Sequence, residues 1–130
     1  MGLEIKKLVL FEPLRYSTNN ADSEEKMTKF TTNVTAKTMN PLPQDYLTQP
    51  VFCGANTNSR TDYTAEIPAG TYAFVQWSQK EKLRLESVAE TLWLECLWQE
   101  FQPKDNTLYL RELPHGDFSM FQLFREILPD

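Results

Sequence analysis

Short runs of strand-forming residues recur along the chain, separated by polar turn sequences. Branched and aromatic side chains dominate these runs, which is typical of β-strands. Pro13 interrupts the first run, and the tight turn 68–70 comes directly before the strongest one, TYAFVQW. The pattern predicts six strands, over residues 4–16, 51–56, 63–67, 71–77, 108–113 and 118–128.

Two other stretches show the spacing of three and four residues that marks an amphipathic helix. The first, residues 23–38, places three apolar side chains on one stripe: Met27, Phe30 and Val34. The second, residues 82–102, is longer, and Pro103 ends it. Its main apolar face comprises Leu85, Ala89, Leu92 and Cys96.

The predicted order of elements is β-α-β-β-β-α-β-β, a β-α-β-β unit repeated twice. A chain of 130 residues is one domain's worth and can bury a core without disulfides or metal. We therefore predict a single α+β domain over residues 1–130. Its antiparallel-rich sheet carries both helices on one face, and a pseudo-two-fold axis relates the two halves.

Charge and hydropathy narrow the classes of function. The formal net charge of −5 falls entirely in residues 66–130, because acidic and basic side chains cancel over residues 1–65. No basic stripe is present, so we expect no nucleic acid as a direct partner. The apolar runs are only a few residues long, where a membrane helix needs about 20, and no secretory signal is recognisable, so we predict a cytoplasmic protein without membrane contact.

The reactive side chains predict neither a metal site nor a cofactor. Cys53 and Cys96 belong to no C-x-x-C pair, and His115 is the single histidine. We expect two reduced, buried thiols and an exposed loop histidine. The chain also lacks a G-x-S-x-G elbow or a Cys–His signature, so enzymatic activity is left open, with binding favoured over catalysis.

The aromatic residues suggest a ligand groove. The chain has 3 Trp, 5 Tyr and 8 Phe, many of them on the predicted strands or the second helix. Aromatic walls take up flat apolar molecules and attract cations, and a carboxylate among them pairs with a positive charge. The candidates are Tyr72, Trp77, Trp93, Trp98, Tyr109, Glu95 and Glu112. The alternative is that the aromatic side chains are core and the two glutamates solvated.

The second helix carries a further apolar stripe opposite its main face, formed by Leu94, Trp98 and Phe101. An exposed stripe of this kind marks a protein interface, and a homodimer buries it by two-fold packing. The Pro-rich segment 39–50 is the other candidate to cover it.

One segment resembles a known family. Residues 67–74, IPAGTYAF, are similar to the "iPaGtYav" segment of the GyrI-like family, the effector-binding domain attached to many bacterial transcription regulators and also found alone. The resemblance covers residues 63–127. It implies a stand-alone domain that binds a small molecule, and some relatives hydrolyse reactive small molecules with an acid and a tyrosine around an aromatic pocket. Inhibitory members sequester a partner protein instead.

Together these observations predict a stand-alone domain that takes up aromatic or cationic apolar ligands in an aromatic groove. We expect the hairpin over 107–127 to bring Tyr109 and Glu112 close to the strand of Tyr72 and Trp77. The alternatives are a hydrolase that uses Glu112 and Tyr109, and a module that binds and inhibits a protein.

Overall fold

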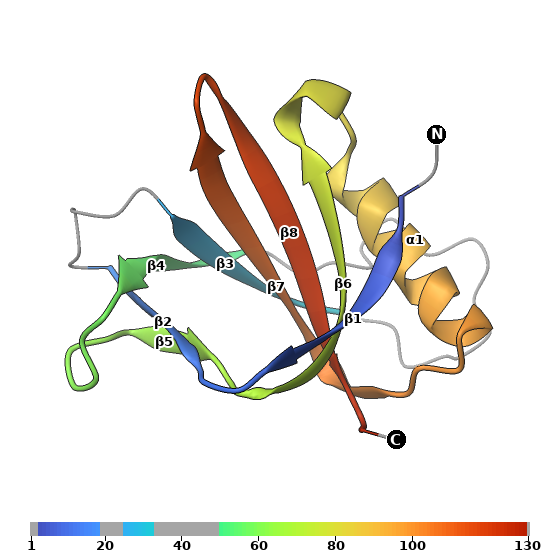
Figure 1. The fold of residues 1–130 in the computed structure, drawn as a ribbon, viewed down its shortest axis with the longest axis horizontal. Helices are drawn as coiled ribbons and strands as arrows, with labels where there is room; N and C mark the ends of the chain where they lie inside the picture. The colour runs from blue at the N-terminus through green and yellow to red at the C-terminus, as the bar shows by residue number, and fades with distance from the viewer. Residues whose placement is uncertain (1–2, 19–24, 33–49, 130) are drawn as a thin grey trace.

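A computed structural model describes residues 3–18, 25–32 and 50–129 of the chain. One α-helix and a single sheet dominate these residues (Figure 1). The elements in chain order are β1 (Ile5–Leu10), β2 (Leu14–Ser17), β3 (Lys26–Thr31), β4 (Val51–Thr57), β5 (Ala65–Ile67), β6 (Gly70–Ser78), the 3-10 turn η1 (Gln79–Glu81), α1 (Leu85–Trp98), β7 (Pro103–His115) and β8 (Phe118–Ile127). No helix among the described residues is long and apolar enough to cross a membrane.

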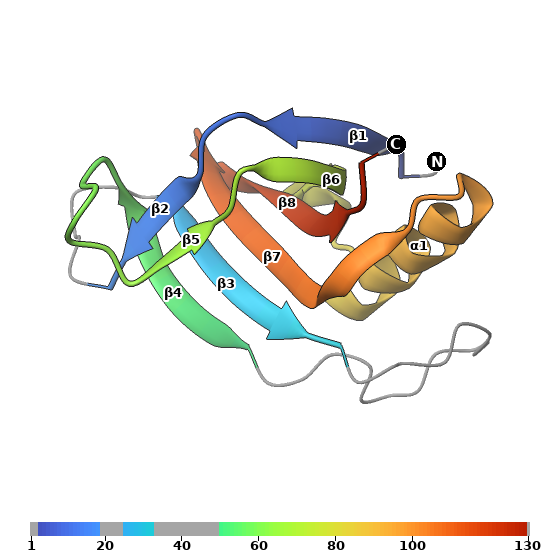
Figure 2. The same cartoon turned by 90° about the horizontal axis from the view of Figure 1, so that it is seen from below.

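The sheet has eight antiparallel strands in the order β1-β6-β8-β7-β3-β4-β2-β5. It curls into a half-barrel, visible from below in Figure 2. Residues 11–13 alone separate β1 from β2, and residues 68–69 alone separate β5 from β6. Strands at one end of the sheet order, β1 and β6, are therefore joined by short connections to strands at the other end, β2 and β5. These two connections keep the two ends of the sheet close together and so maintain its curl.

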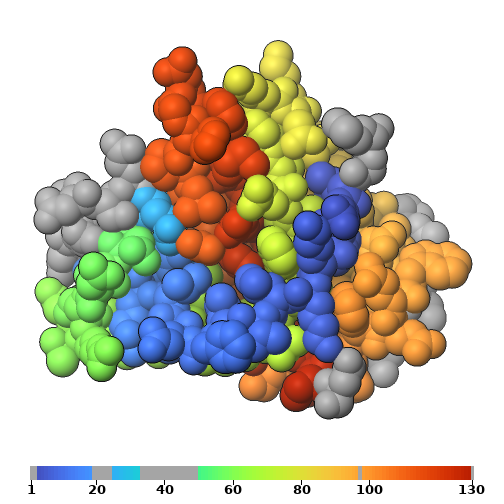
Figure 3. Space-filling model, in the orientation of Figure 1, coloured from blue at the N-terminus to red at the C-terminus, as the bar shows by residue number. Residues whose placement is uncertain are grey.

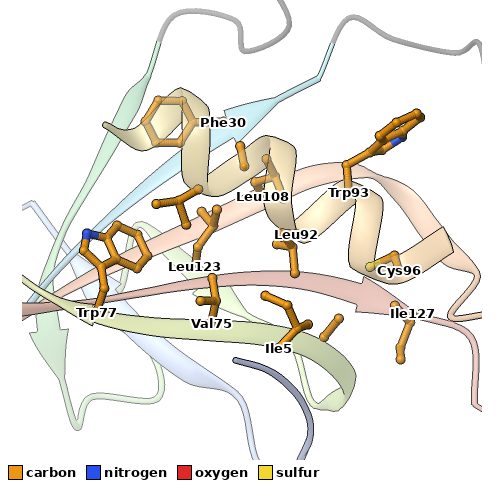
Figure 4. Close-up of a cluster of buried hydrophobic side chains, with 13 residues drawn as sticks. Ile5, Phe30, Val75, Trp77, Leu92, Trp93, Cys96, Leu108, Leu123 and Ile127 are labelled. Carbon is orange, nitrogen blue, oxygen red and sulfur yellow. The ribbon is translucent and has the colours of Figure 1, made fainter. Parts of the chain in front are cut away.

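Two apolar layers form the core, one on each face of the sheet. The outer layer lies between α1 and the sheet, as Figure 4 shows, and it includes Ile5, Phe30, Val75, Trp77, Leu92, Trp93, Cys96, Leu108, Leu123 and Ile127. The inner layer fills the curl with Tyr16, Met27, Cys53, Ile67, Tyr72, Tyr109 and Phe124. Strands in the middle of the sheet are thus buried on both faces.

The predicted helix over residues 23–38 is wrong where the structure describes it. Lys26–Thr31 forms strand β3 in the middle of the sheet, and residues 33–38 lie outside the described part of the chain. Met27 and Phe30 are three residues apart, which suits one helical stripe but also the two opposite faces of a strand. Met27 belongs to the inner layer and Phe30 to the outer layer. A strand with one buried apolar side chain on each face therefore has the same spacing as one stripe of a helix.

The predicted fold class is wrong for the same reason. The described residues contain one α-helix on an eight-stranded curled sheet, in place of two helices and a twice-repeated β-α-β-β unit. The predicted strand over 4–16 is also two strands, because Pro13 ends pairing with β6 and β2 continues against β4 and β5. The helix predicted over 82–102 is present as the shorter α1.

The two apolar sides of α1 differ in burial, which gives a test of the outer layer. We expect Leu92→Ala to lower the free energy of unfolding by about 2–4 kcal/mol, because Leu92 is only 1% exposed. Trp98→Ala should change it by less than about 0.5 kcal/mol, because Trp98 is 82% exposed. Urea denaturation of both variants measures the difference, and equal large losses would contradict this packing.

Candidate functional site

The structure brings two of the predicted site residues together inside the curl. The rings of Tyr72 and Tyr109 meet edge to face with centroids 6.5 Å apart. Tyr72 is fully buried and its hydroxyl donates to the carbonyl of Pro68 at 2.6 Å. Burial raises the pKa of Tyr109 to about 12 and that of Tyr72 further, so both phenols stay protonated at neutral pH.

The other predicted residues lie elsewhere. Trp77 and Trp93 are buried in the outer layer, and Trp98 is exposed at the end of α1. Side chains alternate along β7 without a register shift between Leu108 and His115, so Glu112 points to the opposite face from Tyr109. Glu112 is paired with Phe121 of the outer layer across the ladder. The sheet thus separates the predicted acid from the two tyrosines.

Glu95 lies half-buried on α1. It accepts a hydrogen bond from the side chain of Gln99, one turn further along the helix, at 3.3 Å.

A row of hydrogen-bonded polar side chains, called the polar row below, crosses the inner face of the curled sheet. Arg111 of β7 lies at its centre. Nη1 of Arg111 donates to Oε1 of Gln122 on β8 at 2.8 Å. On the other side of Arg111, its Nη2 pairs with Oε1 of Glu25 at 2.9 Å, and its Nε donates to the hydroxyl of Tyr16 at 3.0 Å. The row ends at Gln76 of β6, whose Oε1 accepts from Nε2 of Gln122 at 2.6 Å.

The arginine end of the row is closed. The side chains of Arg111 and Glu25 are only 15% and 19% exposed, and Tyr16 is fully buried. Tyr16 also donates from its hydroxyl to Oε2 of Glu25 at 2.6 Å. Burial raises the pKa of Tyr16 well above its ordinary value, the contacts with Glu25 add to this, and Arg111 acts in the opposite direction. The side chains of Arg111, Glu25 and Tyr16 therefore hold one another in place, and the negative charge of Glu25 balances the positive charge of Arg111.

The glutamine end of the row is open. A groove of about 220 Å³ lies beside Gln76, lined also by Phe74 of β6, Lys6 of β1 and Glu4. Phe74 is half-buried, and one face of its ring stacks on Phe124 with centroids 5.6 Å apart and an interplanar angle of 23°. Figure 3 shows β6 and β8 recessed between β7 and β1 on this face of the molecule. The groove therefore joins an aromatic wall to the end of the polar row.

The described residues hold no cluster of three or more His, Cys, Asp or Glu side chains able to bind a metal ion. Cys53 and Cys96 are both free and buried. Burial raises the pKa of Cys96 to about 11, which leaves its thiol protonated and unreactive at neutral pH.

Sequence reasoning missed most of this site, although a signal was present. Gln76 and Gln122 each lie between two apolar or aromatic neighbours in a strand, and Arg111 directly follows the apolar and aromatic run over residues 108–110. Such an interruption indicates an inward polar group with partners, because a polar group buried alone is costly. The contact of Arg111 with Tyr16, 95 residues away in the sequence, had no local signal.

Comparison with known proteins adds no relative: no family model, no curated protein and no solved structure matches this chain. The resemblance to the GyrI-like family therefore stays a prediction.

Proposed function

We propose that this chain is a small-molecule-binding domain and that its ligand lies in the groove beside Phe74 and Gln76. The observation that carries the proposal is that Phe74, a half-buried ring, lines the same groove as the open end of a hydrogen-bonded row. The groove combines this one aromatic wall with polar and charged side chains, the kind of group that fixes the orientation of a bound ligand. The buried Arg111 end fixes the row, so the groove is organised before a ligand arrives.

The volume of the groove sets the scale of the part of a ligand that it can surround. An enclosed apolar cavity of about 150 Å³ accommodates benzene. A groove of about 220 Å³ is therefore large enough to receive one aromatic ring, which would stack on the ring of Phe74. Of the ligands predicted from the sequence, a compact aromatic molecule fits best.

The contacts of Glu25 favour binding over hydrolysis. A hydrolase that works with an acid and a tyrosine, as the resemblance implies, needs a carboxylate that is free to activate a water. Each oxygen of Glu25 already has a partner, since Oε1 meets Arg111 and Oε2 accepts from Tyr16. This pair of an acid and a tyrosine supports the architecture of the site, and we assign it no turnover.

The test of the proposed function is a titration with single-ring aromatic compounds of differing charge, followed by backbone amide NMR shifts. We expect shifts centred on β1 and β6 around Lys6, Phe74 and Gln76. Phe74→Leu should raise Kd about 2- to 10-fold, because it removes a stacking contact worth about 0.5–1.5 kcal/mol.

Phe52→Leu is the matched control, because Phe52 is 54% exposed on β4 and lines no part of the groove. It should leave Kd unchanged. Shifts that map to another surface, or equal effects of Phe74→Leu and Phe52→Leu, would refute the proposed site.

A further inference from the structure

We infer that the ligand is an aromatic carboxylate, bound with its ring on Phe74 and its carboxylate at Gln76 and Lys6. This inference rests on the proposed function and specifies its ligand class. Its basis is the direction of the hydrogen bonds along the polar row, which determines what the open end offers.

The direction begins at Arg111. A guanidinium group has five N–H donors and no acceptor, so only an oxygen of Gln122 can face it. Oε1 of Gln122 therefore accepts from Arg111 at 2.8 Å, and its Nε2 is turned toward Gln76. Only an oxygen of Gln76 can accept from that amide, and Oε1 does so at 2.6 Å.

The terminal group of the row is then a donor. Because Oε1 of Gln76 faces Gln122, the Nε2 amide group of Gln76 is left to face the groove. Gln76 is exposed, and its side chain makes no second hydrogen bond with the residues that the structure describes. Because hydrogen bonds in a chain polarise one another, this last N–H is a stronger donor than an isolated amide.

Lys6 supplies a positive charge beside this donor. Lys6 is the direct partner of Phe74 in the ladder between β1 and β6, and its ammonium group lies 3.9 Å from Glu4. The two side chains of this pair are 59% and 78% exposed. Such exposed pairs are weak, so an incoming carboxylate can replace that of Glu4 on Lys6 at little cost. Glu4, the one acidic side chain among the described residues that line the groove, can then turn into solvent.

The spacing of the groups suits a single ring that carries a carboxylate. Phe74 and Gln76 are two residues apart on one strand and point to the same face, which separates them by about 7 Å. A ring on Phe74, its attached carboxylate and one hydrogen bond span that distance. A cationic ring compound would instead meet the donor of Gln76 and the ammonium group of Lys6, and, of the groove lining that the structure describes, only the exposed carboxylate of Glu4 could pair with it.

The decisive experiment compares benzoate, benzamide and benzylammonium, three single-ring compounds of similar size, by amide NMR titration of the full chain. We expect benzoate to bind about tenfold more tightly than the other two, because hydrogen bonds to a charged group are stronger than those to a neutral one. If benzamide or benzylammonium binds in the groove as tightly as benzoate, the inference fails while the proposed function stands. If none of the three shifts Phe74 and Gln76, both fail.

Two exposed lysines of β1 give a matched pair of variants. Lys6 faces the groove, and Lys7 points to the opposite face of the same strand. Lys6→Gln should weaken benzoate about tenfold and benzamide less than about twofold, and Lys7→Gln should leave benzoate unchanged. Gln76→Glu should also weaken benzoate, because it replaces the terminal donor by a negative charge. Equal losses in the two lysine variants would show attraction by net charge alone and overturn the inference.

Discussion

Gly54→Ala is expected to lower the free energy of unfolding by about 3–6 kcal/mol, enough to unfold a domain of ordinary stability. Gly54 has φ +114°, a conformation that residues with a side chain rarely adopt. A Cβ atom there would also overlap the backbone carbonyl group of Ser17 and the amide nitrogen of Thr18. These are backbone atoms of the strand next to β4, so no side chain can turn away to relieve the contact.

Gly116→Ala is the control for Gly54→Ala, because it measures the cost of a positive φ without any steric overlap. Gly116 also has a positive φ, of +65°, but a Cβ atom added there meets nothing within 4 Å. We expect it to cost about 1 kcal/mol. Chemical denaturation of both variants measures the difference. Similar losses would mean that the close approach of β2 to β4 is not as the structure has it.

The close packing at Gly54 belongs to an irregularity that sequence patterns do not reveal. The register between β3 and β4 shifts between Met27 and Thr28, where Gly54 is opposite Met27 and Phe52 is opposite Thr28. The glycine at this point of β4 indicates a bulge or a close backbone approach in general terms. Its actual partner, Ser17, is set by long-range pairing.

Local patterns predicted the elements whose burial is one-sided or whose composition is unambiguous. The aromatic run of β6, the hairpin of β7 and β8, and helix α1 were all found close to their predicted positions. Strand β3 was not, because its two buried side chains, Met27 and Phe30, lie three residues apart, the same spacing that marks one face of a helix. The curl is also invisible in local patterns, since it depends on β1–β2 and β5–β6 reaching both ends of the sheet.

The same distinction explains the candidate site. Aromatic and acidic residues were collected from the sequence by type, but a site requires them on one face of the sheet. Tyr109 and Glu112 are close in sequence and lie on opposite faces, whereas Tyr16 and Arg111 are distant in sequence and in contact. Successive side chains of a strand point to alternate faces, so the face that each residue takes depends on the register of the strands. The register therefore had to be known before these residues could be placed.

Three buried phenols are expected to lower the stability of the domain by about 4 kcal/mol when the pH is raised from neutrality to about pH 11. The buried thiols of Cys53 and Cys96, whose pKa values are raised by burial, add a further loss above about pH 9. Three buried phenols, those of Tyr16, Tyr72 and Tyr109, have a pKa raised above the ordinary value of 10.0, to about 12 for Tyr109 and further for the other two. Between pH 10 and these raised values, the unfolded chain releases three protons that the folded chain retains. The unfolded state then binds fewer protons, so stability falls as the pH rises, by about 1 kcal/mol or slightly more for each tyrosine at about pH 11.

Denaturation at a series of alkaline pH values, with tyrosinate absorbance recorded in parallel, measures this loss. Tyr109→Phe is the informative variant, because Tyr109 makes no side-chain hydrogen bond with the described residues and its ring contacts with Tyr72 are kept. It should change stability little at neutral pH and reduce the alkaline loss by about 1 kcal/mol, since one of the three raised phenols is removed and the two buried thiols are kept. Tyr72→Phe also removes one phenol but loses the hydrogen bond to Pro68, so it should cost about 1 kcal/mol at neutral pH as well. An alkaline loss that Tyr109→Phe leaves unchanged would place that ring outside the buried inner layer of the curl.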